Sequence, residues 1–308
     1  MTTCLLCGSE ELTIKLADVP DTRFASPGKW SILSCDSCAL MQTHPLPTQD
    51  QLKALYERHY NFGGDSGAGG LWRKLRAKLL DSPLYAAFLA IDGDVSFHAR
   101  RGEGRLLDVG CNEGRGLERY RANGFEAEGL ELNAVAAAAA RARGFVVHET
   151  TIDALPREPG YDVVVLSNVL EHALDPRAML AAIHARLKPN GELWISLPNP
   201  ESALARRLGR DWINWHVPFH ITHFTPIRLA RLLGEMRFDV SAARLVTPSL
   251  WVAQSLIARW FPGQPARQRS APLVIALMAL ARGLAFPLLW WWNRTRRGDC
   301  LVMRARRA

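Results

Sequence analysis

The chain has 308 residues, more than one average domain, and its 48% hydrophobic and 22% charged residues exclude a long disordered tract. The formal net charge of +8 is unevenly spread: residues 201–308 hold 17 Lys/Arg against 5 Asp/Glu, a net of +12, whereas residues 1–200 have a net of −4. This basic third indicates a polyanionic partner, either RNA or an anionic membrane surface, or else a solvated arginine-rich surface.

The N-terminal segment carries two cysteine pairs with two residues inside each pair, Cys4 with Cys7 and Cys35 with Cys38. The start of the chain lacks the basic residues and apolar run of an export signal, so we expect a cytoplasmic protein, in whose reducing compartment clustered cysteines usually bind metal. This spacing lets both sulfurs of a pair face one ion. We therefore predict a knuckle over residues 1–45 with a structural zinc; a redox dithiol or buried apolar cysteines are the alternatives.

The segment that follows is predicted to be a helical linker or lid over residues 46–100. Its residues 51–60 are expected to form a short helix, and the five glycines between positions 63 and 70 to form a flexible linker or mobile loop. Residues 71–80 alternate apolar and basic side chains at helical spacing.

From residue 101 to 308, strand patterns alternate with helical ones, which predicts an α/β domain with a doubly wound parallel sheet. Asn133 is expected to cap an alanine-rich helix, and Asp175, followed by proline, to cap a later helix that closes at residues 188–191. Expected strands cover residues 105–109, 126–130, 145–149, 161–167, 192–197, 238–246 and 300–305, and a further helix covers 226–236.

The turn after the first of these strands, residues 110–114, brings backbone close to a ligand at the carboxyl edge of the sheet, where open α/β sheets bind ligands. Glu131 ends the second strand about 20 positions later, where an acidic residue is placed to bind ribose hydroxyls. Alone, this pattern also fits a nicotinamide dehydrogenase, although the glycine spacing differs from G-x-G-x-x-G.

Residues 105–199 closely resemble the class I S-adenosylmethionine-dependent methyltransferases. The matching segments are LLDVGCNEG, the acid Glu131, the DALP turn from Asp153, YDVVVLSNVLEH with ALDP, and LKPNGELWISLPN. The resemblance implies a Rossmann-like fold of the class I type with S-adenosylmethionine as cofactor. In that family the glycine loop cradles the amino-acid end of the cofactor, the acid binds the ribose and the aspartate contacts the adenine. The implied cofactor site comprises Asp108, Gly110, Cys111, Asn112, Gly114, Glu131, Leu132, Asp153, Ala154 and Asn168, and Asn112 stands where many members have glycine.

The resemblance covers nearly the whole chain. The cysteine pairs, a P-x-P linker and tyrosines at 56 and 60 are similar to features of the methyltransferases of bacterial polysaccharide, deoxysugar and secondary-metabolite pathways. Methyl transfer to a hydroxyl or an acidic C–H also requires removal of a proton, which suits histidine. The His-rich segment 212–225 resembles the acceptor side of sugar methyltransferases, in which a histidine is the base. By that resemblance His220 is the first candidate base, His172 the second and His223 the third.

Other roles are open for these histidines, which would also serve as helix caps or fill a wet crevice. A metal held by His216, His220 and His223 is a further alternative, although no carboxylate accompanies them. Glu171 is expected to orient His172 or to cap a helix.

Before the last strand, residues 248–295 are predicted to form an apolar helical insert. Residues 272–292 are long enough for a transmembrane helix, but one crossing would separate the final strand from its sheet. We expect peripheral contact with the cytoplasmic face of a membrane, with the tryptophans at 290–292 and the arginines after them at the headgroups. Packing on the sheet or in a homodimer is the alternative.

The sequence therefore predicts a methyltransferase of the EC 2.1.1 type that acts on a sugar or on a lipid-linked glycan or secondary-metabolite acceptor with a histidine base. The alternative is an RNA methyltransferase whose knuckle and basic C-terminal region bind nucleic acid. Few arginines and lysines lie between the cysteine pairs, which disfavours RNA. A cofactor-binding scaffold without activity is a third interpretation.

Overall fold

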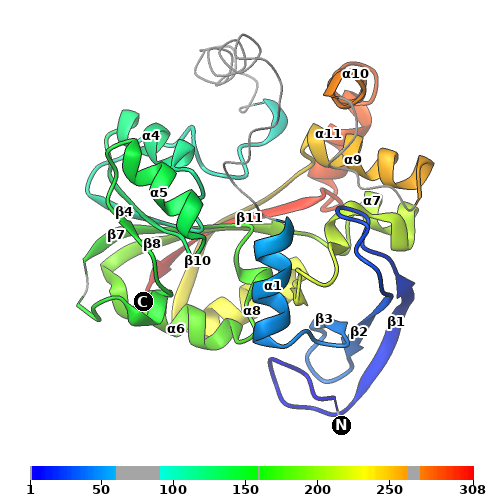
Figure 1. Ribbon diagram of the computed structural model, residues 1–308, viewed down its shortest axis with the longest axis horizontal. Coiled ribbons are helices and arrows are strands. Elements are labelled where there is room, and N and C mark those ends of the chain that lie inside the picture. Colours follow the sequence, from blue (N-terminus) through cyan, green and yellow to red (C-terminus); the bar gives the residue numbers. More distant parts are fainter. Residues whose placement is uncertain (1, 60–90, 159, 263–270) are drawn as a thin grey trace.

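A computed structural model describes residues 2–59, 91–158, 160–262 and 271–308 of the chain (Figure 1). The glycine-rich linker and the helical pattern predicted between residues 63 and 80 lie outside these residues. The described strands form two sheets, one of seven strands and one of four. The larger sheet positions the predicted cofactor residues, and the smaller one carries the cysteine segment.

The seven-stranded sheet confirms the predicted Rossmann-like α/β fold. Its order is β10-β11-β8-β7-β4-β5-β6, with β4 to β8 parallel and β11 antiparallel to both of its neighbours, β8 and β10. The chain runs outward from β4 to β6 and then in the other direction from β7, so a topological switch point lies between β4 and β7. The strands cover Arg105–Val109 (β4), Glu126–Leu130 (β5), Val147–His148 (β6), Tyr161–Ser167 (β7), Leu187–Pro198 (β8), Phe238–Val246 (β10) and Cys300–Arg307 (β11).

Helices cover both faces of this sheet, with α4 and α5 on one face and α6 and α8 on the other (Figure 1). Neighbouring residues of β4 divide between the two layers, because side chains alternate along a strand. Leu106 belongs to the apolar cluster of Leu117 in α4, and Leu107 belongs to that of Leu180 in α6. The helices cover Arg115–Ala122 (α4), Ala134–Ala142 (α5), Pro176–Arg186 (α6) and Pro226–Glu235 (α8).

Both predicted helix caps are confirmed, since Asn133 accepts the Ala136 N–H at 3.0 Å and Asp175 accepts the Ala178 N–H at 2.9 Å. Two boundaries were wrong. The third strand has only two residues, and α6 ends before the predicted stop at 188–191. There, Tyr161 pairs with Leu187 but Val163 pairs with Glu192, so residues 188–191 form a bulge inside β8. Proline, asparagine and glycine suit such a bulge as well as a helix stop.

The four-stranded sheet has the order β1-β2-β3-β9. Its strand β9 comes from the loop after β8 and pairs with β3, so that His223 lies opposite Met41. A strand therefore joins the N-terminal segment to the histidine-rich loop. The elements cover Leu12–Val19 (β1), Trp30–Cys35 (β2), Met41–His44 (β3), Thr222–His223 (β9) and the helix Gln49–His59 (α1) that follows β3.

The apolar insert is helical, as predicted. Among the described residues no single helix has the length and apolar character to cross a bilayer, although the pair Pro272–Gly283 and Phe286–Arg294, which meet at 68°, meets both criteria when taken together. The insert comprises Ser249–Trp260 (α9), Ala271–Gly283 (α10) and Phe286–Arg294 (α11). Other elements are connected by the short helix α7 (Ala203–Leu208) and by the 3-10 turns η1 (Ile152–Ala154), η2 (Leu170–His172), η3 (Gly209–Asp211) and η4 (Ile213–Trp215).

Candidate functional site

The segments that carry the predicted site residues meet at the carboxyl edge of the large sheet. They are the turn after β4, the end of β5, η2 after β7 and the loop after β8. Backbone hydrogen bonds join them in two places: Gly110 N–H donates to Leu130 O at 2.7 Å, and Ile221 N–H donates to Glu171 O at 2.7 Å. These segments flank the switch point, which is where open α/β sheets bind ligands.

The turn after β4 requires left-handed backbone conformations. Gly110, Asn112 and Gly114 have φ values of 74°, 49° and 78°, which glycine and asparagine adopt at least cost. A Cβ at Gly114 would lie 2.8 Å from the Cβ of Ala140 in α5. The Asn112 side chain donates to Gly110 O at 3.0 Å, which stabilises the turn with asparagine at that position.

Glu131 lies beside this turn at the end of β5. Its Oε2 accepts the Asn112 N–H at 3.0 Å and its Oε1 accepts the Asn133 N–H at 2.8 Å. A carboxylate oxygen accepts two hydrogen bonds, so each oxygen retains one acceptor site for a ligand. Burial, reinforced by the charge of Glu131, raises the pKa of Asp108 to about 7. The two carboxyl groups make this edge of the sheet rich in acceptors.

Asp153 lies in η1 and its side chain is exposed. A hydrogen bond from the Thr151 side chain lowers the pKa of Asp153. Arg186 of α6 holds this turn in place by donating to Asp153 O at 2.8 Å. Arg186 is not among the predicted site residues, because its role depends on a contact between distant segments that no local pattern indicates.

Asn168 follows β7, and its buried Oδ1 has no hydrogen-bond partner among the described residues. A buried acceptor of this kind marks a place for a donor on a ligand. The left-handed turn, the open acceptor sites of Glu131 and the oxygen of Asn168 fit S-adenosylmethionine, whose ammonium and ribose hydroxyls are donors. Of the other predicted members of this site, Cys111 is buried, and Leu132 and Ala154 are exposed next to Glu131 and Asp153.

His220, the first predicted base, is buried in the loop after β8. Its Nδ1–H donates to the backbone oxygen of Asn214 at 2.8 Å, which fixes the neutral tautomer and leaves a lone pair on Nε2. Burial lowers the pKa of His220 well below its ordinary value. The ring is therefore neutral, and Nε2 is its acceptor atom.

His172 lies at the end of η2, and its ring centroid is 4.6 Å from that of His220. Its Nδ1 is 2.9 Å from the backbone oxygen of Phe219 and 2.7 Å from the hydroxyl of Tyr56 in α1. Burial lowers the pKa of His172 to about 4. Tyr56 thus contributes to the histidine cluster from the N-terminal segment, a contact that the sequence did not predict.

Glu171, which the sequence predicts to orient His172 or to cap a helix, is the carboxylate beside His220. Its Oε1 lies 3.9 Å from His220 Nε2, and neither carboxylate oxygen has a hydrogen-bond partner within the described ranges. Burial raises the pKa of Glu171 to about 8. The expectation that no carboxylate accompanies the histidines is therefore wrong. Ligand atoms of Glu171 and His172 in η2 and of His220 in the loop after β8 lie within 4.8 Å of one another, so these three residues form a group that could hold a cation.

His223 and His216 contact protein groups. His223 Nε2 lies 3.1 Å from Oγ1 of Thr43 in β3, whose hydroxyl donates to the backbone oxygen of His220 at 2.6 Å. Because the hydroxyl hydrogen is used in that bond, Nε2–H of His223 is the donor to Thr43. Burial lowers the pKa of His223 to about 3. The His216 ring stacks on that of Phe219, with centroids 4.7 Å apart.

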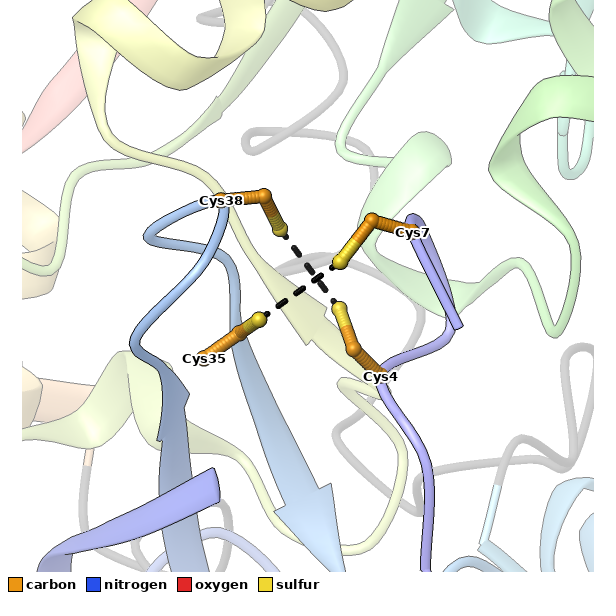
Figure 2. A group of neighbouring side chains, drawn as sticks. All are labelled: Cys4, Cys7, Cys35 and Cys38. Carbon is orange, nitrogen blue, oxygen red and sulfur yellow. Dashed lines mark hydrogen bonds between the residues drawn. The ribbon is translucent and has the colours of Figure 1, made fainter. Parts of the chain in front are cut away.

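The sulfurs of the four N-terminal cysteines point toward one another, as Figure 2 shows. The Sγ atoms of Cys4 and Cys38 are 3.5 Å apart, those of Cys7 and Cys35 are 3.6 Å apart, and all four lie within 4.8 Å of one another. A tetrahedral zinc with Zn–S bonds of about 2.3 Å separates its sulfurs by about 3.8 Å. The predicted donor set therefore has the spacing that suits zinc.

The cysteine segment packs on the rest of the chain. Cys4 and Leu6 share an apolar cluster with Leu180 of α6. Arg177 of α6 donates from Nε to Leu6 O at 3.0 Å. Arg23 donates from Nη2 to Asn214 Oδ1 at 3.1 Å, next to the Asn214 backbone oxygen that orients His220. The knuckle and the histidine loop are thus joined by side chains as well as by the β3–β9 pairing.

Comparisons with known proteins place this geometry in a family. A family model described as "Methyltransferase domain" matches residues 71–242, more than half of the chain. The "Ubiquinone biosynthesis O-methyltransferase" of Marinobacter nauticus is 31% identical over 121 residues, which are 35% of this chain and 51% of the relative. The protein of the same name from Sodalis glossinidius is 33% identical over 142 residues, 42% of this chain and 56% of the relative. The chain spans about half the length of the curated relatives it matches.

Two solved methyltransferase structures are similar to this chain. An S-adenosylmethionine-dependent methyltransferase from Mesorhizobium loti superposes with a TM-score of 0.47 and 19% identity, covering 70% of this chain and 100% of that one. The 1,6-didemethyltoxoflavin-N1-methyltransferase of Burkholderia thailandensis has a TM-score of 0.48 and 18% identity, and the match covers 92% of this chain and 97% of that one.

Proposed function

Because the chain belongs to the class I S-adenosylmethionine-dependent methyltransferases, we propose that it methylates a hydroxyl group of a sugar or of a lipid-linked glycan or secondary-metabolite acceptor. The observation that most supports an acceptor with a removable proton is His220, a buried neutral imidazole whose Nε2 lies near Glu171 and His172. The relatives are named as O-methyltransferases, which favours a hydroxyl over nitrogen or carbon.

The proposed cofactor site is the carboxyl edge around the turn after β4. Residues 110–114 would hold the amino-acid end of S-adenosylmethionine, Glu131 the ribose hydroxyls and Asp153 the adenine. When bound, the cofactor supplies an electrophilic methyl group on a sulfonium centre. The retained acceptor sites of Glu131 favour this assignment, as does Oδ1 of Asn168, which has no hydrogen-bond partner in the described part of the chain.

His220 is proposed as the base. Its Nε2 would take the proton of the acceptor hydroxyl as that oxygen receives the methyl group and the sulfur–methyl bond breaks, with S-adenosylhomocysteine as the leaving group. Asn214 O stabilises the developing imidazolium through Nδ1–H. His172 and His223 remain the second and third candidates.

We also propose that Cys4, Cys7, Cys35 and Cys38 bind a structural zinc. The sulfur spacing supports it, and a site closed by four thiolates has no open coordination position for chemistry. The zinc would hold the N-terminal loop against the turn between β2 and β3.

The test of the base compares wild type with His220→Ala and with a control variant, His184→Ala. His184 lies in α6, and its ring packs against that of Phe238 in β10. Formation of S-adenosylhomocysteine is measured with a panel of nucleotide sugars and lipid-linked hydroxyl acceptors. His220→Ala is expected to bind cofactor normally in calorimetry but to lose turnover on the order of a hundredfold. Unchanged turnover in His220→Ala would show that another group is the base.

Two further measurements separate the alternatives. Tight, salt-sensitive binding of labelled RNA together with methyl transfer to it would replace the sugar assignment with the nucleic-acid one. Loss of turnover in a chelator, with a second metal ion per chain besides zinc, would assign Glu171, His172 and His220 to a cation instead of to proton transfer.

A further inference from the structure

The helical insert gathers exposed apolar side chains. Of the eighteen large apolar residues that are exposed in the described part of the chain, ten lie between positions 250 and 291. Leu284, Ile275 and Trp291 are 82%, 64% and 56% exposed. Figure 1 shows α9, α10 and α11 together at the right of the view, apart from α4 and α5. Such a concentration of exposed apolar surface indicates a face that another body covers.

The inner faces of these helices are packed on the protein. Leu277 and Ala281 of α10 and Leu289 of α11 are buried. Arg282 forms an ion pair with the buried Asp92 and donates to Thr247 O at 2.6 Å. The helices are therefore anchored on one side, and the exposed side chains belong to their outer faces.

The charged side chains of α10, α11 and the residues after them are of one sign. Residues 271–298 contain four arginines and no acidic residue. Arg282 is used in the ion pair, whereas Arg294, Arg296 and Arg297 are exposed at the end of α11. The guanidinium of Arg294 lies 4.3 Å from the centroid of the Trp290 ring, so a cation and an aromatic ring are presented together. Tryptophan beside arginine is typical of protein surfaces that meet phosphate headgroups.

We propose that α10 and α11 dock on the surface of an anionic lipid bilayer. At 13 and 9 residues the helices are about 20 and 14 Å long, shorter than the hydrocarbon core of about 30 Å, and they meet at 68°. They therefore lie in the interface, with leucine, isoleucine and tryptophan side chains entering the acyl boundary and the three arginines on lipid phosphates. Membrane docking is independent of methyl transfer, so each proposal can fail without the other.

The test measures flotation of the full chain with vesicles of phosphatidylcholine alone and with added phosphatidylglycerol, at low and high salt. Wild type is expected to float with the anionic vesicles and to be partly released by salt. A triple variant, Arg294→Gln, Arg296→Gln and Arg297→Gln, should weaken binding on the order of a hundredfold, because each arginine contributes roughly fivefold. The corresponding lysine variant keeps the charge and should retain binding.

A second variant tests the apolar contribution. Trp291→Ser with Leu284→Ser changes only exposed side chains and should reduce binding by at least about tenfold, whereas the control Ile227→Ser, an exposed apolar residue on α8, should bind as wild type does. Equal loss in the control, or no flotation with anionic vesicles, refutes the proposal. A third outcome would show that a second copy of the chain covers this face instead. In that outcome wild type is a dimer that does not bind vesicles, and the variant Trp291→Ser with Leu284→Ser is a monomer.

Discussion

The proton affinity of His223 provides a test of the packing between β9 and β3. Its ring is buried, and its pKa of about 3 lies below the value of about 6.5 expected in an unfolded chain. A lowered histidine pKa contributes stability that is fully present above the unfolded value and is lost as the pH falls toward the folded value. Near pH 5 the unfolded chain binds the proton and the folded chain does not, which costs about 2 kcal/mol.

His223→Gln removes this titration and keeps a donor for Thr43. The buried carboxyl groups, whose raised pKa values make stability fall as the pH rises, are present in both proteins, so their effect cancels in the comparison. Urea unfolding of both proteins is measured near pH 7.5 and near pH 5. The free energy of unfolding of wild type minus that of the variant should fall by about 2 kcal/mol between the two conditions. A difference that stays constant within 0.5 kcal/mol, roughly the error of such extrapolations, would mean that His223 is not buried as a neutral ring.

Three further predictions follow from the same contacts. Gly114→Ala should weaken S-adenosylhomocysteine binding by at least about tenfold in calorimetry, because an added Cβ would lie 2.8 Å from Ala140 and φ is 78°. The control Gly234→Ala, where an added Cβ has nothing among the described residues within 4 Å, should bind normally. Equal affinities of the two variants would contradict the assigned turn. Between pH 7 and pH 9, the free energy of unfolding of Glu171→Gln should rise by about 1.4 kcal/mol relative to that of wild type. The reason is that a carboxyl group whose pKa is raised to about 8 loses its contribution to stability as the pH rises through that value. The same difference between the two proteins at both pH values would disprove the buried carboxyl. Cys35→Ser should lose one bound equivalent of zinc in metal analysis and should have a lower melting temperature, because Cys35 belongs to the main apolar cluster. A wild type whose melting temperature is the same with and without metal would exclude the structural zinc.

Local signals predicted local features well. The caps Asn133 and Asp175 lie where short-range hydrogen-bonding preferences put them, and the strands 105–109, 126–130, 161–167 and 238–246 have the predicted bounds. Strand β6 is shorter than its apolar pattern, and the bulge at residues 188–191 uses the same residue types as a helix stop. In both cases the pairing partner, which the pattern does not specify, decided the outcome.

The candidate site could be predicted only in part for the same reason. The residues of the turn after β4 and the four cysteines follow from spacing along the chain. The approach of Glu171 to His220, the reach of Tyr56 to His172 and the bond from Thr43 to the His220 backbone join segments far apart in sequence. Such contacts depend on how the two sheets are placed against each other, which no window of the sequence encodes.

The strand pair β3–β9 has a thermodynamic consequence for the whole molecule. One edge of the cysteine-bearing sheet is built from the loop that holds His220, and Thr43 binds that loop through both His220 and His223. Order in the loop and order in the knuckle are therefore linked quantities, and linkage is reciprocal. A metal bound in the knuckle would then lower the free-energy cost of ordering the histidine loop around an acceptor, and an acceptor that orders the loop would raise the affinity for metal at Cys38, 182 residues before His220 in the chain. In that case the concentration of metal in the surrounding medium would act on the proposed base from a distance, with no ion at the reacting atoms.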